Sequence, residues 1–253
     1  VHIQCTEENE FRVTPEQIKE VLTEKTKMLI LSYPNNPTGA VLRHEDLVGI
    51  AEVLKDTDVI VLSDEIYAEL CYGDEEYESI AHIEGMYDRT IVVNGFSKSF
   101  SMTGWRLGYA MGPKPLIETM TKIHQSCIMC SPTTSQYAGI TALTSCDEEI
   151  LKMKEEYDFR RKYCVRKLNE MGLHTFEPRG AFYVFPNITS SGMDSDTFCM
   201  ELLKRKNVAI VPGTAFGESG EGFARISYAY SLSHLQTALG RIEDFLHEIK
   251  EEK

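Results

Sequence analysis

The sequence has no excess of basic residues. Its 253 residues include 26 Lys and Arg against 39 Asp and Glu, which gives a formal net charge of −13. A protein that follows the phosphates of a nucleic acid depends on neutralisation by Lys and Arg, and this chain lacks a basic block. It also lacks an apolar run near the about 20 residues that a bilayer span requires. These absences argue against nucleic-acid and membrane partners.

Cysteine is also sparse. The seven cysteines are an odd number, spread along the chain, and this density is far below that of a disulfide-stapled scaffold. The first residues, Val1–Gln4, show neither the basic nor the apolar region of a signal peptide. We therefore expect a reducing, cytoplasmic setting. Because the sequence starts without Met, we also expect it to be part of a longer protein.

One cysteine cluster invites a metal interpretation. The segment His124–Cys130 holds one histidine and two cysteines, but a Zn²⁺ site needs a fourth ligand and no second Cys/His pair follows. The spacing of three residues also places Cys127 and Cys130 along one face of a helix, where cysteine acts as a small hydrophobic residue. We predict no metal site.

The first half of the chain alternates between helical and strand-like segments. Thr14–Gln17 has the pattern of a capping box with Pro at the first helical position, which predicts a helix to about residue 25. A second helix is expected over 44–55. Apolar strands are expected at 28–31, 59–62, 90–93 and 107–110. Short apolar strands between helices are typical of a sheet covered on both faces, so the predicted fold class is α/β.

The second half has a different character. A helical pattern runs from about 114 to 145, and a long charged helix runs from Asp147 to about Met171. Beyond it we expect helices near 195–206 and 232–250, and short strands at 173–176, 181–185, 208–211 and 223–229. This part is predicted to be a smaller α+β domain, which divides the chain into domains 1–148 and 149–253.

Polar loops follow the predicted strands of the first half, at the sheet edge where open α/β sheets bind ligands. The loop 32–39, with two Pro, two Asn and a Gly, is by itself a rigid turn. Asp64 is either a helix cap or a buried functional carboxylate, and alone it favours the cap. Lys98 stands among Phe, Trp, Met and Gly in a loop expected to be partly buried. A buried lysine is costly unless it is paired or used chemically, for instance in a Schiff base.

Several short motifs occur in a specific order. They are Asn36–Gly39, Asp64 with Tyr67, Ser97–Lys98, Gly104–Gly108, Gly180–Tyr183 and Phe223–Ser227. In this order they resemble the class I and II aminotransferases, which are fold-type-I enzymes that use pyridoxal 5′-phosphate (PLP). The likeness covers essentially the whole chain. It implies the C-terminal part of the PLP-binding large domain, with a mixed, mostly parallel sheet between helices, followed by a smaller α+β domain.

The resemblance also implies catalytic roles. Lys98 would hold the cofactor aldehyde as a Schiff base and then act as a general base. Asp64 would pair with the pyridine nitrogen and keep the ring an electron sink. Asn36 and Tyr67 would hydrogen-bond the phenolic oxygen of the ring.

Phosphate and substrate binding are implied in the same way. Ser97 and Arg106 would bind the cofactor phosphate, and Arg225, with Asn36, would bind the substrate α-carboxylate. By itself Arg225 is better explained by an ion pair with an acidic residue. One departure stands out, because Gly95 occupies a position that is often a phosphate-binding hydroxyl in this family.

The expected function is therefore amino-group exchange between an amino acid and a 2-oxo acid by a homodimer, in the branch that resembles bacterial aspartate or aromatic aminotransferases. The resemblance implies a further segment ahead of Val1 that would supply a phosphate turn, a stacking aromatic and most side-chain specificity. Alternatives are another fold-type-I activity, such as a C–S β-lyase or a carboxylate-cyclising synthase, and a non-catalytic fragment or regulatory domain. The segment 113–145 is either a dimer-associated surface or only a buried helical layer.

Overall fold

The chain divides into two units in the computed structural model, which describes residues 1–73 and 76–252. Unit 1 consists of Val1–Ile3, Arg12–Asn35 and Val41–Lys154, and unit 2 consists of Gln4–Phe11, Asn36–Ala40 and the chain from Glu155 onward. The predicted domains 1–148 and 149–253 place the segments 4–11 and 36–40 in the first domain, whereas their contacts group them with unit 2. The domain boundary of the complete protein stays a prediction.

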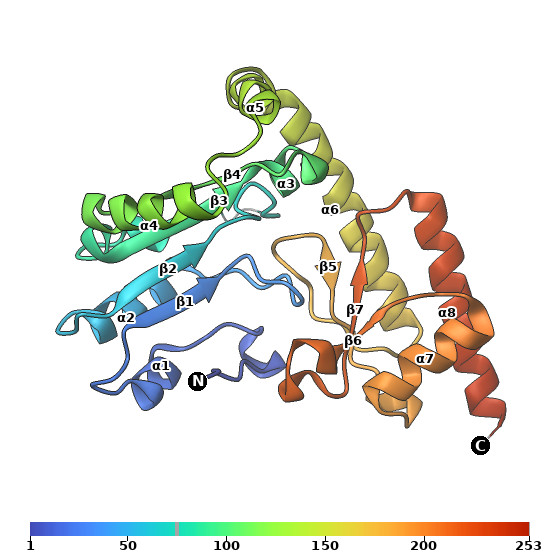
Figure 1. The fold of residues 1–253 in the computed structure, drawn as a ribbon. Helices are drawn as coiled ribbons and strands as arrows, with labels where there is room; N and C mark the ends of the chain where they lie inside the picture. The colour runs from blue at the N-terminus through green and yellow to red at the C-terminus, as the bar shows by residue number, and fades with distance from the viewer. Residues whose placement is uncertain (74–75, 253) are drawn as a thin grey trace. The chain divides into compact units, whose positions relative to one another are not determined.

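Unit 1 is built on a four-stranded sheet (Figure 1). Its strands, in spatial order, are β1 (Met28–Ser32), β2 (Ile60–Asp64), β3 (Thr90–Gly95) and β4 (Gly108–Met111). The first three are parallel, and β4 runs antiparallel to β3. The α/β class and the mostly parallel sheet are confirmed. Parallel pairing brings the carboxyl ends of β1, β2 and β3 to one edge.

The helices of unit 1 begin where local chemistry favours them. They are α1 (Pro15–Val21), α2 (His44–Leu54), α3 (Phe96–Ser99), α4 (Lys114–Cys127), α5 (Thr133–Ser145) and the first part of α6 (Asp147–Glu170). The predicted capping box is present, because the Thr14 hydroxyl accepts from the Gln17 amide and the Gln17 side chain accepts from the Thr14 amide. The helical pattern predicted over 114–145 is interrupted between α4 and α5, where Met129 has φ +73° and Pro132 precedes α5.

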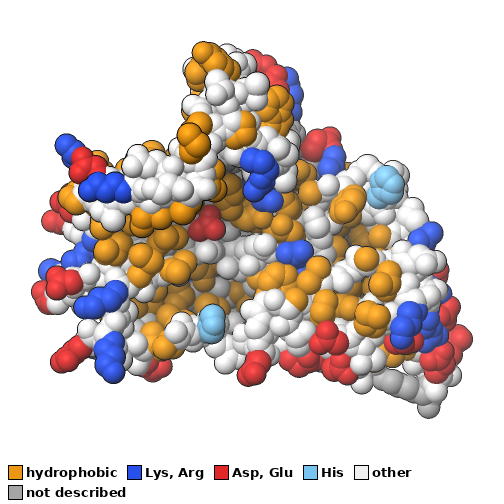
Figure 2. Space-filling view, viewed as in Figure 1, with side chains coloured by type: hydrophobic (Ala, Val, Ile, Leu, Met, Phe, Trp, Pro, Cys, Tyr) orange, Lys and Arg blue, Asp and Glu red, His pale blue; other side chains and the backbone are white. Residues whose placement is uncertain are grey.

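The sheet is covered less completely than predicted. Leu31 and Val61 are buried, but Ile30 on β1 exposes 63% of its surface. Figure 2 shows hydrophobic side chains gathered over the strands of unit 1. The alternative of a buried helical layer over 113–145 holds only in part: α4 has no buried residue and Ile123 is 63% exposed, whereas α5 buries Ser135, Gly139 and Ala142. Apolar runs indicated that these surfaces are suited to burial, but no described residue covers them.

The described residues of unit 2 form a small antiparallel sheet and three helices. Its strands, in spatial order, are β5 (Tyr183–Val184), β7 (Ala224–Ser227) and β6 (Val211–Pro212). Its helices are the remainder of α6, α7 (Ser195–Lys206) and α8 (Leu232–Glu251). Phe198 on α7 and Phe245 on α8 pack edge to face, with ring centroids 5.5 Å apart. The α+β character of this part of the chain agrees with the prediction.

One predicted strand of unit 2 is wrong. Residues 173–176 form no strand; the Thr175 amide instead donates to the Asn169 side chain at 3.1 Å, and the Thr175 hydroxyl donates to the Leu173 carbonyl at 2.8 Å. Side-chain hydrogen bonds thus close a local turn in place of sheet pairing. The alternating apolar pattern of this segment instead reflects packing. Phe176, for example, lies against Phe11 with ring centroids 5.9 Å apart.

The remaining connections contain short 3₁₀ turns. These are η1 (Glu7–Asn9), η2 (Ile80–His82), η3 (Tyr87–Arg89), η4 (Thr103–Trp105), η5 (Thr189–Ser191), η6 (Gly213–Phe216) and η7 (Glu218–Gly220). Within the described parts of the chain, no helix combines the length and apolar character that crossing a membrane requires.

Candidate functional site

Asp64 and Lys98 follow neighbouring strands at the carboxyl edge of the unit 1 sheet. Asp64 is the last residue of β2 and pairs in register with Val93 of β3, and Lys98 lies five residues beyond Val93 in α3. The Asp64 carboxylate accepts from the Ile66 amide at 3.3 Å, which forms a turn. The helix cap favoured from this residue alone is wrong, because the described residues directly after Asp64 form a turn and no helix.

The structure brings Tyr67 and Lys98 together. Tyr67 is buried in the turn after β2, and the ammonium of Lys98 lies 5.9 Å from the centroid of its ring. A cation at this distance over an aromatic face is attracted by the ring quadrupole, which helps to fix the direction of the lysine side chain. The edge of unit 1 therefore combines an amine, a phenol and a carboxylate from two adjoining loops.

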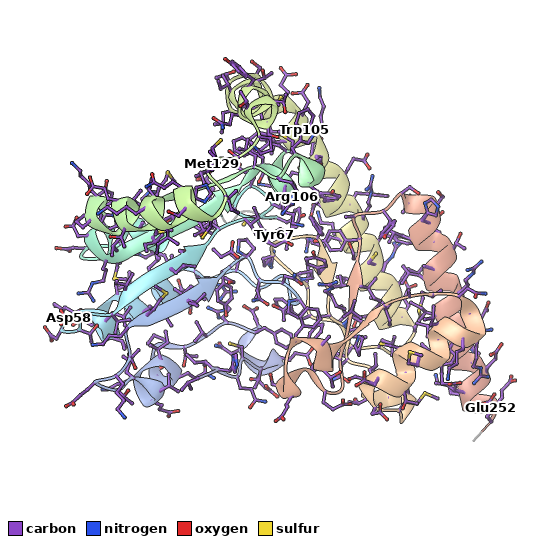
Figure 3. The ribbon with its side chains drawn as sticks, in the orientation of Figure 1. Asp58, Tyr67, Trp105, Arg106, Met129 and Glu252 are labelled. Atoms are coloured by element: carbon purple, nitrogen blue, oxygen red, sulfur yellow. The ribbon has the colours of Figure 1, made fainter. Side chains whose placement is uncertain are left out.

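Ser97, in α3, and Arg106, in the loop before β4, are linked through hydrogen bonds of Thr103. The Thr103 hydroxyl donates to the Ser97 carbonyl at 3.1 Å, and the Arg106 guanidinium donates to the Thr103 carbonyl at 2.8 Å. Arg106 is exposed and has a left-handed backbone with φ +52°. Figure 3 shows Arg106 and Trp105 on this loop before β4, and Tyr67 after β2. Sequence reasoning missed Thr103, whose contacts depend on the folded loop.

The loop that carries Lys98 is partly buried, as predicted. Phe96 and Met102 are buried in a cluster that includes Ala142 of α5, whereas Trp105 is exposed. The buried Ser135 hydroxyl, also from α5, donates to the Trp105 carbonyl at 2.6 Å. Ser135 was not identified from the sequence, because a lone serine on a helix carries no signal of a partner thirty residues away.

The glycine at position 95 has a steric explanation. Gly95 pairs with Gly108 across β3 and β4, and a Cβ atom at position 95 would lie 3.1 Å from the Leu107 carbonyl oxygen and 3.2 Å from the Gly108 Cα. These distances are shorter than ordinary van der Waals contacts. The close approach of the two strands therefore crowds any side chain at this position, which often carries a hydroxyl in the family, unless the neighbouring backbone shifts by a few tenths of an ångström.

In unit 2, Arg225 is held in a defined orientation. It lies on β7, and its guanidinium is 4.6 Å from the ring centroid of Tyr183 and 4.9 Å from that of Phe216. One of its terminal nitrogens donates to the Asn36 amide oxygen at 2.8 Å. In the described chain its buried Nε has no hydrogen-bond partner, and its side-chain acceptor is an amide, not a carboxylate. This leaves a buried donor suited to an anionic ligand.

Asn36 reaches Arg225 because the segment 36–40, which belongs to unit 2, is hydrogen-bonded to residues 179 and 180. The Gly39 carbonyl accepts from the Arg179 amide at 3.0 Å and from the Gly180 amide at 2.8 Å. Gly39 has φ +73°, a conformation that favours glycine, and it packs closely against this segment. The Pro- and Asn-rich loop thus contains a turn over 36–38, as its composition predicted, and this turn also aligns a polar side chain.

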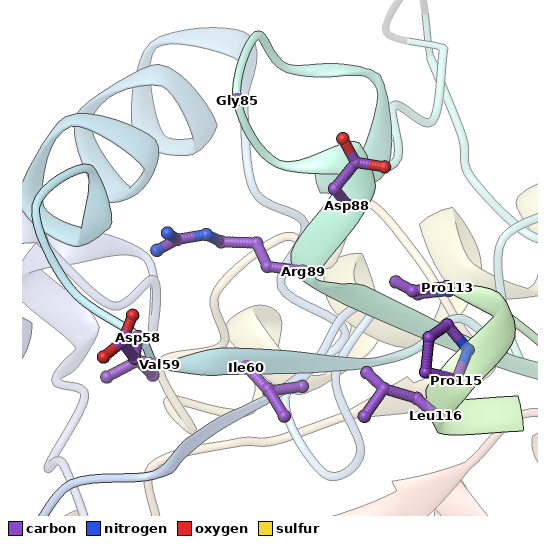
Figure 4. Close-up of a pocket in the computed structure, with 9 residues that line it drawn as sticks. All are labelled: Asp58, Val59, Ile60, Gly85, Asp88, Arg89, Pro113, Pro115 and Leu116. Carbon is purple, nitrogen blue, oxygen red and sulfur yellow. The ribbon is translucent and has the colours of Figure 1, made fainter. Parts of the chain in front are cut away.

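Other features lie away from these residues. A pocket in unit 1 lies where β2 and β3 begin (Figure 4). Its lining includes Asp58, Val59, Ile60 and Arg89. That is the end of the strands opposite to Asp64. No group of three or more potential metal ligands was found among the described residues, and Cys127 and Cys130 are exposed and unbridged.

The chain matches the aminotransferase class I and II family over residues 1–242. It therefore belongs to this family, whose enzymes depend on PLP. It is 50% identical over 248 residues to a putative aminotransferase, YugH, of Bacillus subtilis, and 48% identical over 254 residues to an aspartate aminotransferase of Pyrococcus abyssi. The crystal structure of an aromatic aminotransferase from Pyrococcus horikoshii superposes with a TM-score of 0.96 at 46% identity, covering 99% of this chain and 68% of that one.

These relatives are longer than the chain. The match covers 98% of the chain but 64% of the Bacillus protein, and 99% of the chain but 65% of the Pyrococcus abyssi protein. The family and the fold-type-I architecture are thus established for the chain, and they agree with the resemblance seen in its motifs.

Proposed function

We propose that the complete protein is a PLP-dependent aminotransferase that exchanges an amino group between an amino acid and a 2-oxo acid. The observation that carries this proposal is the grouping of Lys98, Tyr67 and Asp64 at the carboxyl ends of adjacent parallel strands. An amine, a phenol and a carboxylate are the groups needed to attach, orient and ionise a pyridine aldehyde.

Each polar group of the cofactor has a suitable partner among the residues of unit 1. PLP, when bound, supplies an electron sink for the bonds at the substrate α-carbon. Asp64 would hold a proton on the pyridine nitrogen, and Tyr67 would donate to the phenolic oxygen of the ring. Ser97 and Arg106 would bind the phosphate, for which a guanidinium fork is well suited. Lys98 would hold the aldehyde end and carry a proton to and from the α-carbon.

The residues of unit 2 fit the substrate. An amino acid and a 2-oxo acid share a carboxylate, and Arg225 has a buried Nε donor without a partner in the described residues. Asn36, which accepts from another nitrogen of the same guanidinium, would keep the fork oriented. A hydrogen bond from Asn36 to the phenolic oxygen of the cofactor is what the family resemblance implies. The relatives are named for aspartate and for aromatic amino acids. Both classes of amino acid carry the α-carboxylate that Arg225 and Asn36 would bind.

We also propose that the complete protein works in the cytoplasm as a homodimer. The support for the location is the set of seven unbridged cysteines, which is usual where thiols are kept reduced. The support for assembly is the exposed apolar surface of α4 and α5, which is larger than isolated exposed side chains explain.

The test uses the full-length protein loaded with PLP. Borohydride reduction followed by peptide mapping is expected to place the cofactor on Lys98, and addition of an amino acid is expected to release one equivalent of the matching 2-oxo acid. Lys98→Ala should lose both properties, whereas Lys114→Ala, an exposed lysine at the start of α4, should keep both. Attachment to another lysine would contradict the site. Release of pyruvate and ammonia from a cysteine conjugate, without amino transfer, would instead support the β-lyase alternative.

A further inference from the structure

A buried carboxyl group stands next to the candidate site without belonging to it. Glu65 directly follows Asp64 and is only 5% exposed. Successive residues at a strand end point to opposite sides, and Asp64 is the more accessible of the two. Since a carboxyl group is rarely buried unless it is paired or hydrogen-bonded, Glu65 requires a physical explanation.

The Glu65 side chain is satisfied by hydroxyl groups. One of its carboxyl oxygens accepts from the Ser63 hydroxyl at 2.9 Å and from the Ser79 hydroxyl at 2.6 Å. Tyr77 belongs to the same cluster, because burial and then the nearby Glu65 charge raise the pKa of its phenol. Ser79 is itself fixed at the start of η2, where its hydroxyl accepts from the Ala81 amide at 3.2 Å. The cluster therefore ties the end of β2 to a segment fourteen residues farther along the chain.

The backbone of Glu65 also makes hydrogen bonds that fix the turn after β2. Its amide donates to the Val93 carbonyl at 2.8 Å, which extends the pairing of β2 with β3 by one residue. Its carbonyl accepts from the Ala68 amide at 2.9 Å, and this bond closes the turn that contains Tyr67. Asp64 and Tyr67 thus flank a residue whose backbone and side chain are both anchored.

We propose that Glu65 is a positioning residue, which fixes the turn that presents Asp64 and Tyr67 through its hydrogen bonds to Ser63 and Ser79. This inference rests on the proposed function, because it assigns Glu65 a role only through the cofactor contacts of its two neighbours. A small displacement of such groups is costly, since a misplacement of about 1 Å can reduce a rate about 100-fold.

The test compares three variants of the full-length, PLP-loaded protein. Glu65→Ala removes the acceptor, Ser79→Ala removes one donor in a milder way, and Glu65→Gln keeps an acceptor oxygen of nearly the same shape. We expect the first two to weaken PLP binding at least about threefold and to lower kcat about 10- to 100-fold. They should also shift the pH midpoint of the cofactor's visible absorbance by about one unit. Glu65→Gln should keep most of the wild-type PLP affinity, kcat and absorbance midpoint. Glu69→Ala, which removes an exposed carboxyl of the same turn, should change none of these three quantities.

The outcomes separate the two proposals. If Glu65→Ala and Ser79→Ala lower the melting temperature but leave the absorbance midpoint, PLP affinity and kcat within twofold of wild type, Glu65 has only a structural role and this inference is wrong. If the wild-type protein binds no PLP, the proposed function fails and this inference fails with it. If Glu65→Ala does not fold, Ser79→Ala decides the question by the same three measurements.

Discussion

Arg225 illustrates how single side chains are oriented in this protein. Its guanidinium lies over the rings of Tyr183 and Phe216, and Asn36 accepts one of its hydrogen bonds. Stacking on two aromatic faces restricts rotation of the guanidinium plane, and the amide fixes one edge of it. The entropic cost of ordering a long arginine side chain is therefore met before any ligand binds.

Arg225→Ala should impair substrate binding and leave cofactor binding intact. In the full-length enzyme we expect kcat/KM to fall by the equivalent of about 2–5 kcal/mol, since a desolvated carboxylate would lose its charged partner. The visible absorbance of the bound cofactor should be nearly unchanged. Steady-state kinetics and absorbance spectra measure both effects, and Arg166→Ala, an exposed arginine of the same unit, is the control. Loss of PLP with a normal KM for amino acids would place Arg225 at the cofactor instead.

At the scale of elements, functional segments are positioned by close approach of backbones. Gly95 and Gly108 allow β3 and β4 to meet beneath the Lys98 loop. Gly39 allows the loop that carries Asn36 to approach the segment 178–180. That segment is held in turn by Arg161 on α6, which is fully buried and donates to the Pro178 carbonyl at 2.9 Å. Small residues and buried donors thus set the spacing of the elements.

Gly39→Ala should destabilise the protein more than Gly172→Ala. Both glycines have a left-handed backbone, so each substitution costs about 1 kcal/mol in backbone strain. At Gly172 an added Cβ meets nothing within 4 Å, whereas at Gly39 it would overlap the Pro178 Cβ and lie 2.8 Å from the Gly180 carbonyl oxygen. This overpacking should cost a further about 1–3 kcal/mol. Urea unfolding monitored by circular dichroism measures the free energy of unfolding of both variants. Equal losses of stability would contradict the prediction, because they would mean that the loop around Gly39 accommodates the added Cβ without a further energetic cost.

At the scale of the whole molecule, the distribution of apolar surface is uneven. Ile123 and Met120 of α4, Tyr137 and Ile140 of α5, and Met129 between the two helices are all exposed, Met129 by 79%. Exposed apolar side chains are normal when scattered, but a run of this kind along two successive helices indicates a surface suited to burial.

The 253-residue chain alone should therefore self-associate, whereas the complete protein should be a dimer. Light scattering over a range of concentrations is expected to show a mass above that of a monomer. The double variant Ile123→Glu with Ile140→Glu should reduce the association, because each charge would have to be desolvated in the contact. Met200→Glu, at an exposed apolar residue of α7, should not. A monomeric chain at high concentration would contradict this expectation.

Much of the fold could be predicted because it rests on local patterns. The four strands of unit 1 coincide with short apolar runs, and α1 begins at its capping box. The strand predicted at 173–176 was wrong because Asn169 competes for the backbone there, which alternation of polar and apolar residues does not reveal.

The candidate site was predicted through its motifs, but its supports were not. Glu65, Thr103 and Ser135 act through hydrogen bonds to groups that only the folded chain brings near. Likewise, Arg225 and Asn36 are 189 residues apart in sequence. Contacts of this kind leave no periodic pattern, so residue types alone could not assign them.

The interleaving of the two units has a consequence for synthesis of the chain. Phe11 is buried in unit 2 against Phe176, Phe185 and Phe223, with ring centroids 5.9, 5.8 and 5.6 Å away. A ribosome makes Phe11 long before it makes these three partners, so Gln4–Phe11 must wait for nearly the entire chain to emerge. Non-local pairing of this kind slows folding and lengthens the time during which an apolar segment is unprotected. The nascent chain should thus need a chaperone most in the interval before residue 223 leaves the ribosome.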